Sequence, residues 1–291
     1  MTEPMFFDVQ VEGGSMQVAR WAGDGDGPIV LGLHGITASS ISLAPLAGAG
    51  RVVVAPDLRG RGGSASLPGP YGMSAHAQDC AAVIAAVTGG DPVVVVGESM
   101  GAFVAVTLAA THPMLVRKLV LVDGGIPLPL PPAAIADPDA TTDALLGPAI
   151  ERLRMTFAST DQYLDHWRDH PALAEAWNDE VEAYLRYDLT GPPGALRSKV
   201  NEEAVRADAR DTIVGAGALD AALRAVTCPI HLLRATRNLM NALPPLLPDE
   251  AVEPWKTALP NLVDEVVPDT NHYSIVFGDR GRAAVVAAIA D

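Results

Sequence analysis

Ser99 lies within the sequence Gly-Glu-Ser-Met-Gly at positions 97–101, between two segments of different character. The preceding run 93–96 is four valines, which favour a β-strand, and the alanine-rich segment 102–110 favours an α-helix. A serine in a sharp turn from strand to helix has a strained backbone, and flanking glycines leave room for that turn. Its hydroxyl would be exposed above the sheet, beside the free N–H groups at the start of the helix. The pattern therefore predicts a nucleophile.

His272 is the candidate base for this nucleophile. It follows the valine-rich segment 263–267, which predicts the last strand, and sheets of parallel strands bind their ligands at the strands' carboxyl ends. An imidazole with an ordinary pKa of about 6.5 can take up and return a proton near neutral pH. Five other histidines fall on predicted helix faces, helix ends or a strand and lack this setting: His76, His112, His166, His170 and His231.

Two backbone N–H groups are candidates to bind an oxyanion formed at the serine. The N–H of Met100 lies at the start of the predicted helix, and that of Ile36 follows the predicted strand 29–33. Gly35 lets the main chain turn toward a substrate at this point. We expect the neighbouring His34 to hold the loop in place rather than to take part in the chemistry.

Short apolar segments and helical patterns alternate along most of the chain. The predicted strands are 6–11, 16–21, 29–33, 51–55, 93–96, 118–122, 230–233 and 263–267, and the helices 74–87, 102–110 and 279–290. The first two strands are separated by a short polar turn and form a predicted β-hairpin. Valine-rich strands joined by helical crossovers predict an α/β fold whose parallel sheet is buried on both faces.

The alternation stops between residues 126 and 227. This segment opens with a proline-rich run at 127–132 and holds six of the fourteen aromatic residues of the chain. Its helical patterns lie near 145–157, 161–168 and 175–187. We predict a core of residues 1–125 and 228–291, with residues 126–227 inserted as a helical cap that selects the substrate through its apolar side chains.

Together these elements resemble the α/β-hydrolase superfamily, in the branch of esterases, lactonases and cofactor-free perhydrolases. The resemblance covers residues 6–123 and again 229–291. Beyond the serine turn, it rests on His34-Gly35, on Pro-Asp-Leu-Arg-Gly-Arg-Gly-Gly-Ser at 56–64, and on Asn271-His272-Tyr273. The resemblance implies a mostly parallel, twisted sheet flanked by helices, with no metal ion and no cofactor. In this family the loop equivalent to 56–64 is structural, so we expect no catalytic role for it.

The acidic partner of His272 has two candidates. Most family members place an acid after the strand equivalent to 230–233, where this sequence has Asn238. An asparagine cannot supply the negative charge that stabilises an imidazolium. Some members place the acid one strand earlier, and Asp123 ends the predicted strand 118–122, next to the strand of the nucleophile. We expect Asp123 to contact Nδ1 of His272, with Asn238 as the alternative.

The resemblance implies a serine hydrolase of carboxylic esters. Ser99 would attack the carbonyl, His272 would act as base and then as acid, and the N–H groups of Ile36 and Met100 would hold the oxyanion. Family members that cleave epoxides or haloalkanes need aspartate at the nucleophile position. Two alternatives remain: a cofactor-free perhydrolase or lactonase of the same fold, and a non-catalytic ligand-binding protein, which Asn238 would favour.

Composition narrows the classes of partner. A net charge of −15 argues against binding to nucleic acid or to anionic membranes. No apolar stretch approaches the roughly 18 residues of a membrane span, and the N-terminus is acidic where a secretory signal is basic. We expect a cytoplasmic protein that acts on a small-molecule ester, and a homo-oligomer is compatible with the sequence. Cys80 and Cys228 predict two buried free thiols.

Overall fold

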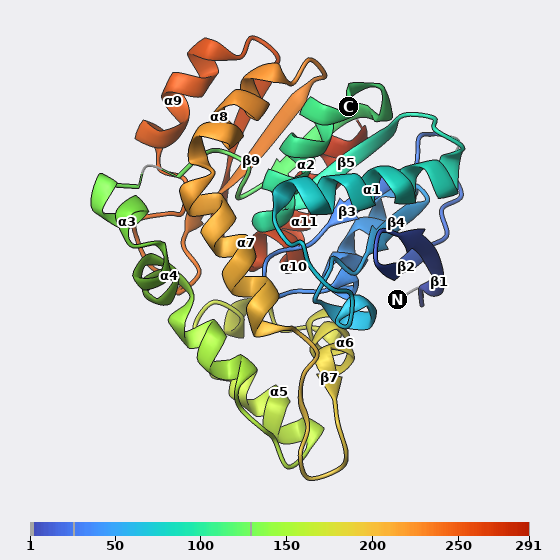
Figure 1. Cartoon of the computed structure of the whole chain (residues 1–291), viewed down its shortest axis with the longest axis vertical. Helices are drawn as coiled ribbons and strands as arrows, with labels where there is room; N and C mark the ends of the chain where they lie inside the picture. Colours follow the sequence, from blue (N-terminus) through green and yellow to red (C-terminus); the bar gives the residue numbers. More distant parts are fainter. Residues whose placement is uncertain (1–2, 26, 129, 291) are drawn as a thin grey trace.

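The computed structural model describes residues 3–25, 27–128 and 130–290. Eight strands form one twisted sheet with helices on both faces (Figure 1). In order across the sheet they are β1 (Met5–Val11), β2 (Gly14–Trp21), β4 (Val53–Pro56), β3 (Val30–Leu33), β5 (Val93–Glu98), β6 (Val116–Val122), β9 (Ile230–Arg237) and β10 (Leu262–Asn271). β2 pairs antiparallel with both β1 and β4, and the other neighbouring strands of this described sheet pair in parallel. The predicted α/β-hydrolase fold is confirmed.

The valines of β5 show how the two helical layers are held to the sheet. Successive side chains of a strand point to opposite faces. Val93 and Val95 belong to one apolar cluster, and Val94 and Val96 belong to the other. All four are at most 3% exposed, as expected for a parallel strand covered on both sides.

Each face of the sheet has its own set of helices. One cluster contains side chains of α1 (Met73–Thr88), α2 (Met100–Thr111), α8 (Ala216–Ala225) and α9 (Asp249–Ala258). The other contains side chains of the 3₁₀ helix η1 (Ser40–Ala49) and of α10 (Ser274–Phe277) and α11 (Asp279–Ala290). The sheet is thus enclosed, and its carboxyl edge remains the place where loops can form a site.

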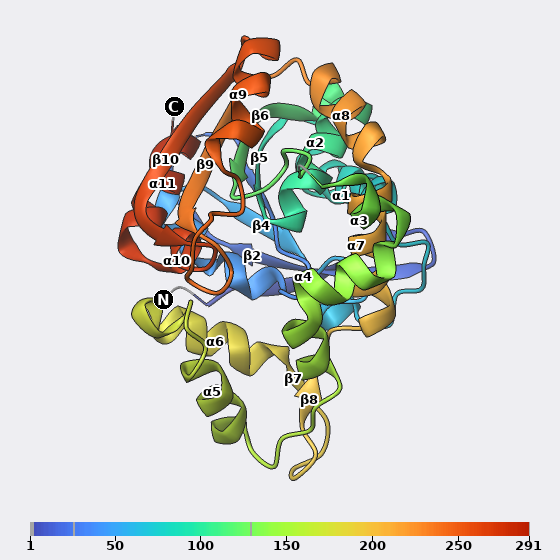
Figure 2. The same ribbon diagram turned by 90° about the vertical axis from the view of Figure 1, so that its left-hand side faces the viewer.

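The segment between β6 and β9 is mostly helical. It contains α3 (Pro132–Ala136), α4 (Pro138–Leu153), α5 (Thr160–Arg168), α6 (Asp179–Asp188) and α7 (Glu202–Val214), with a small ladder of β7 (Leu189–Thr190) and β8 (Arg197–Ser198). In Figure 2, α5, α6 and the β7–β8 hairpin project beyond one end of the sheet. The last helix of the segment, α8, packs on α2 through Leu219 and Leu223 and so joins the layer on the sheet.

Two further features bear on the expectations from composition. Within the described residues, no helix is both long enough and apolar enough to cross a membrane. Cys80 and Cys228 are free thiols, as predicted. Cys80 is buried on α1 as predicted, but Cys228, just before β9, is only half-buried, so the prediction of its burial is wrong.

Candidate active site

Ser99 joins β5 to α2 in a tight turn. Its backbone has φ 53° and ψ −118°, a conformation that residues with a side chain rarely adopt. A Cβ atom at position 97 would lie 2.4 Å from the carbonyl oxygen of Gly101, and one at position 101 would lie 2.1 Å from that of Leu33. Only glycine fits at either position, so the two glycines permit the strained turn that presents the serine.

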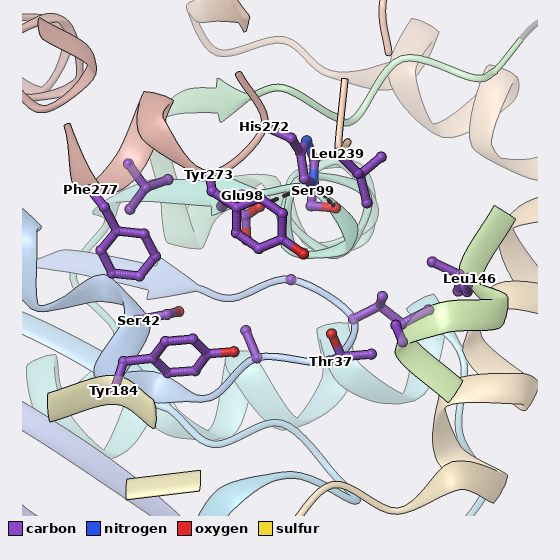
Figure 3. A pocket seen from close by; sticks show the side chains of 15 residues that line it. Thr37, Ser42, Glu98, Ser99, Leu146, Tyr184, Leu239, His272, Tyr273 and Phe277 are labelled. Carbon is purple, nitrogen blue, oxygen red and sulfur yellow. Dashed lines mark hydrogen bonds and ion pairs between the residues drawn. The ribbon is translucent and has the colours of Figure 1, made fainter. Parts of the chain in front are cut away.

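Three side chains from separate segments meet at this turn. The Oγ of Ser99 lies 3.0 Å from Nε2 of His272, and Nδ1 of His272 lies 2.6 Å from Oδ2 of Asp123 (Figure 3 shows the first pair). β5 and β6 are adjacent and parallel, so Ser99 and Asp123 reach the same edge of the sheet. His272 follows β10. The structure therefore brings together the three side chains that the sequence singled out.

Asp123 is held rigidly. It is fully buried, and its second oxygen, Oδ1, accepts the backbone N–H of Ala235 at 3.1 Å. Burial alone would lower the pKa of His272, but the hydrogen bond and charge of Asp123, together with the charge of Glu98, raise that pKa above its ordinary value. The carboxylate thus favours the protonated imidazole and fixes which ring nitrogen faces Ser99.

Asn238, the alternative partner of His272, is engaged elsewhere. Its Oδ1 accepts the backbone N–H groups of Met240 at 2.9 Å and Ala242 at 3.1 Å, which closes a turn after β9. The side chain in contact with Nδ1 of His272 is that of Asp123.

The two predicted oxyanion donors belong to the same pocket as the serine. Ile36 and Met100 both line it, beside Ser99 and His272. Among the described residues, the N–H groups of Ile36 and Met100 donate to no backbone carbonyl. Both are therefore available to an oxygen atom of a bound molecule.

His34 orients the first of these donors. Its Nδ1 donates to the carbonyl of Gly35 at 2.8 Å, and its Nε2 accepts the N–H of Leu58 at 3.0 Å. Burial lowers the pKa of His34 to about 3, so the ring is neutral with its proton on Nδ1. The C=O and N–H of a trans peptide point in opposite directions. Holding the Gly35 carbonyl therefore turns the N–H of Ile36 away from His34.

Glu98 is a site residue to which the sequence analysis assigned no role. Its Oε1 lies 3.4 Å from Nε2 of His272, and its side chain is 13% exposed (Figure 3). Burial raises the pKa of Glu98 to about 7, against the opposing charge of His272. The available signal was its position immediately before the nucleophile, at the end of a strand. That signal does not tell which way the side chain points.

The cavity around Ser99 has two lobes, which share Ile36, Leu146, Leu239 and His272. One lobe, called the polar lobe here, is lined by Thr37, Ser42, Glu98, Tyr184 and Tyr273 together with the apolar side chains of Val276 and Phe277 (Figure 3). The other, called the apolar lobe, is lined largely by Phe103, Leu128, Leu130, Leu145, Ile213 and Leu246. A molecule bound at Ser99 can therefore place chemically different groups on its two sides.

The fold and this site define a hydrolase scaffold with a serine at the strand-to-helix turn. The chain belongs to the alpha/beta hydrolase family, whose model matches residues 30–288.

Particular relatives give finer comparisons. The sequence is similar to 2-(acetamidomethylene)succinate hydrolase of Mesorhizobium japonicum, with 37% identity over 102 residues. This match spans 34% of the chain and only about a third of the relative, 36% of its length.

Solved structures show the same fold over nearly the whole chain. E-2-(acetamidomethylene)succinate hydrolase superposes with a TM-score of 0.79 at 24% identity, covering 99% of this chain and 100% of that one. The N-formylmaleamic acid deformylase of Pseudomonas putida S16 gives a TM-score of 0.70 at 20% identity, with 99% and 100% covered. The thioesterase domain from the curacin biosynthetic pathway gives 0.76 at 19% identity, with 99% of both covered.

Proposed function

We propose that the chain is a serine hydrolase that cleaves carboxylic esters through an acyl-enzyme on Ser99. The observation that carries the proposal is the continuous contact from Ser99 Oγ to His272 Nε2 and from His272 Nδ1 to Asp123. A nucleophile, a base and an orienting acid in hydrogen-bond contact are the parts that acyl transfer requires.

The first half of the reaction forms the acyl-enzyme. His272 Nε2 takes the proton of the Ser99 hydroxyl while the oxygen attacks the ester carbonyl. The N–H groups of Ile36 and Met100 stabilise the negative oxygen of the tetrahedral intermediate. His272 then gives its proton to the leaving alcohol, and the acyl group stays on Ser99.

The second half restores the enzyme. His272 takes a proton from a water molecule, whose oxygen attacks the acyl carbon, and returns it to Ser99 as the carboxylic acid leaves. Asp123 stabilises the imidazolium that forms in each half. It also keeps the proton of the neutral ring on Nδ1, so that Nε2 can accept from Ser99.

Covalent labelling tests this proposal directly. A fluorophosphonate should add one phosphonyl group to Ser99, located by mass spectrometry of the digested protein, and Ser99→Ala should take up none. Turnover of p-nitrophenyl esters should disappear in the same variant. A wild-type protein that gains no mass on Ser99 would contradict the proposal and leave the non-catalytic ligand-binding alternative.

We further propose that the helices of residues 126–227 act as a cap over this site. Leu145 and Leu146 of α4 and Ile213 of α7 line the apolar lobe, and Tyr184 of α6 lines the polar lobe. Side chains of the inserted helices thus form walls on both sides of Ser99, which is the position from which a cap selects substrates.

Amide hydrolysis is a second candidate, favoured by two relatives. The names of the acetamidomethylenesuccinate hydrolase and the N-formylmaleamic acid deformylase both place an acyl group on nitrogen in the substrate. The same serine chemistry serves both bonds and differs in the leaving group. Matched probes separate the two: the ester proposal expects p-nitrophenyl acetate to be turned over and p-nitroacetanilide not to be. Comparable kcat/KM values for both would favour the amide.

A further inference from the structure

Arg61 lies in the loop 56–64, for which the sequence predicted no catalytic role, yet it contacts both residues of the proposed oxyanion site. Its side chain is fully buried. We propose that Arg61 is a positioning residue that holds Ile36 and Met100 in place for oxyanion binding. We further propose that Asp208 on α7 makes this support depend on the inserted helices. The proposal rests on the proposed function, because it assigns Arg61 a part in that reaction.

The contact with Ile36 is a hydrogen bond. Nε of Arg61 donates to the carbonyl of Ile36 at 3.0 Å, while His34 holds the preceding carbonyl, that of Gly35. The two peptide units on either side of Ile36 are therefore each fixed by a buried side chain. The N–H of Ile36 belongs to the first unit, which His34 orients, and without Arg61 the second unit would lose its hydrogen bond, so that Ile36 would be held from one side only and its N–H could be displaced. A displacement of about 1 Å at a reacting group can cost roughly 10²-fold in rate.

The contact with Met100 joins the loop to the nucleophile helix. Nη2 of Arg61 lies 3.9 Å from Sδ of Met100, in the first turn of α2. The direction of the Met100 N–H is set mainly by the helix itself. What Arg61 adds is a bridge between the two segments that supply the two donors, so that their separation is maintained.

Asp208 is the buried counter-charge that keeps Arg61 in this position. An unpaired guanidinium inside a protein is strongly destabilising. Nη1 of Arg61 forms an ion pair with Oδ2 of Asp208, which also lies 3.0 Å from Nε2 of His76. The other oxygen, Oδ1, accepts the N–H of Gly72 at 2.6 Å. Burial alone would raise the pKa of Asp208, but His76 and Arg61 lower it to about 2, so the carboxylate is charged at neutral pH.

The position of Asp208 on α7 links this support to the cavity. Ala209 and Ile213 of the same helix line the apolar lobe. A shift of α7 would therefore change the apolar lobe and the ion pair of Arg61 together. The oxyanion site is thus coupled to the packing of the inserted helices.

Arg59, two residues away, provides a matched control. It is also buried and also paired with an aspartate, since its Nε and Nη2 donate to Asp79 of α1 at 2.5 and 2.8 Å. Its remaining hydrogen bonds go to the carbonyls of Pro68 and Glu12. Replacing either arginine removes a buried ion pair, but only Arg61 contacts the oxyanion residues.

The test compares Arg61→Met with Arg59→Met on p-nitrophenyl acetate. Arg61→Met should lower kcat roughly 10- to 100-fold with KM within about twofold, while Arg59→Met keeps the wild-type kcat. Affinity for a boronic acid, whose tetrahedral adduct places an oxygen in the oxyanion site, should fall by a similar factor in Arg61→Met only. Melting temperatures of the two variants show whether the loss of stability is comparable.

Further variants keep the test decisive if the methionine variants do not fold. Arg61→Lys retains the charge, but one ammonium cannot replace the planar guanidinium, so kcat should still fall relative to Arg59→Lys. Asp208→Asn should lower kcat in the same direction, and an unchanged kcat there would overturn the link to α7. Folded Arg61 variants with the kcat and boronate affinity of their Arg59 counterparts would overturn the whole inference. The proposed function is judged separately, by whether the wild-type protein is labelled on Ser99.

Discussion

The polar and apolar lobes of the cavity meet at Ser99 but are built from different parts of the chain. Thr37, Ser42, Glu98 and Tyr273 of the polar lobe belong to segments that follow or end the strands, and Tyr184 is added by α6. The apolar lobe takes its walls largely from the inserted segment, through the loop after β6 and through α4 and α7. Most hydrogen-bonding groups of the polar lobe are thus carried by segments at the strand ends, whereas most walls of the apolar lobe are supplied by inserted helices that pack over the sheet.

This difference predicts how the two lobes share the work of recognition. A hydrogen bond requires a defined distance and direction, which groups anchored at the strand ends can maintain. Apolar burial is non-directional and depends mainly on area, so helices that shift slightly can still supply it. We therefore expect the polar lobe to fix the orientation of the substrate and the apolar lobe to set the size of group accepted.

The largest effect is expected where the two lobes meet. Asp123→Asn should lower kcat by roughly 10⁴-fold, because the amide favours the wrong tautomer of His272 and cannot stabilise the imidazolium. The loss should be the same for every substrate, since it affects the chemistry rather than either lobe. Steady-state kinetics on several p-nitrophenyl esters measure it.

Asn238→Ala is the control for that experiment. Asn238 hydrogen bonds within its own turn, so kcat should stay within about twofold of the wild-type value, as for a substitution outside the reacting groups. A reversed result, with Asp123→Asn active and Asn238→Ala impaired, would contradict the assignment of the acid.

A smaller and selective effect is expected in the apolar lobe. Ile213→Ala removes three carbons from a side chain that is 3% exposed and lines this lobe. At about 0.8 kcal/mol per buried CH₂, kcat/KM for a long-chain ester should fall by roughly 10-fold or more, while that for an acetate ester changes little. Chain length is varied once in the acyl group and once in the alcohol, because either one can occupy the lobe.

Ser42→Ala is the matched change in the polar lobe. It should leave the dependence on chain length unaltered, since it adds or removes no apolar wall. If Ile213→Ala lowers kcat/KM equally for short and long chains in both series, the apolar lobe does not select by size.

The sequence predicted the strands and the serine turn well because these depend on local patterns. The valines of β5 and the two glycines around Ser99 each have a short-range physical reason that can be recognised in a few residues. The meeting of Asp123 with His272 required one further step, the expected order of neighbouring strands, which the hydrolase resemblance supplied.

Contacts between remote polar residues could not be predicted in this way. Arg61 and Asp208 are 147 residues apart, and the helix that carries Asp208 has no fixed register relative to the loop of Arg61 until both pack. Glu98 was visible beside the nucleophile, but a strand residue can face either side of the sheet, and its approach to His272 depends on the path of a distant loop. Arg61, Asp208 and Glu98, the three residues missed by the sequence, are therefore those whose role comes from packing alone.

The smallest effect concerns the charge in the polar lobe. His272 must be neutral to accept the proton of Ser99, so activity is lost as the pH falls through the pKa of His272. The carboxylate of Glu98 contributes to raising that pKa, and Asp123, the other acid that faces the ring, stays in place. Glu98→Gln should therefore lower the pKa of His272 and move the acid limb of kcat/KM to lower pH, with little change at the optimum.

The rate of fluorophosphonate labelling, measured as a function of pH, should fall at low pH with the same pKa of His272 and needs no substrate. It depends on the reactivity of Ser99 and is independent of how either lobe binds an ester. Ser42→Ala removes a hydroxyl but no charge from the same lobe. In this variant the labelling rate should fall at the same low pH as in the wild-type protein. If the labelling rate of Glu98→Gln falls at the same pH as that of the wild-type protein, or at a higher pH, the charge of Glu98 does not act on His272. The polar lobe would then differ from the apolar lobe in hydrogen bonding alone.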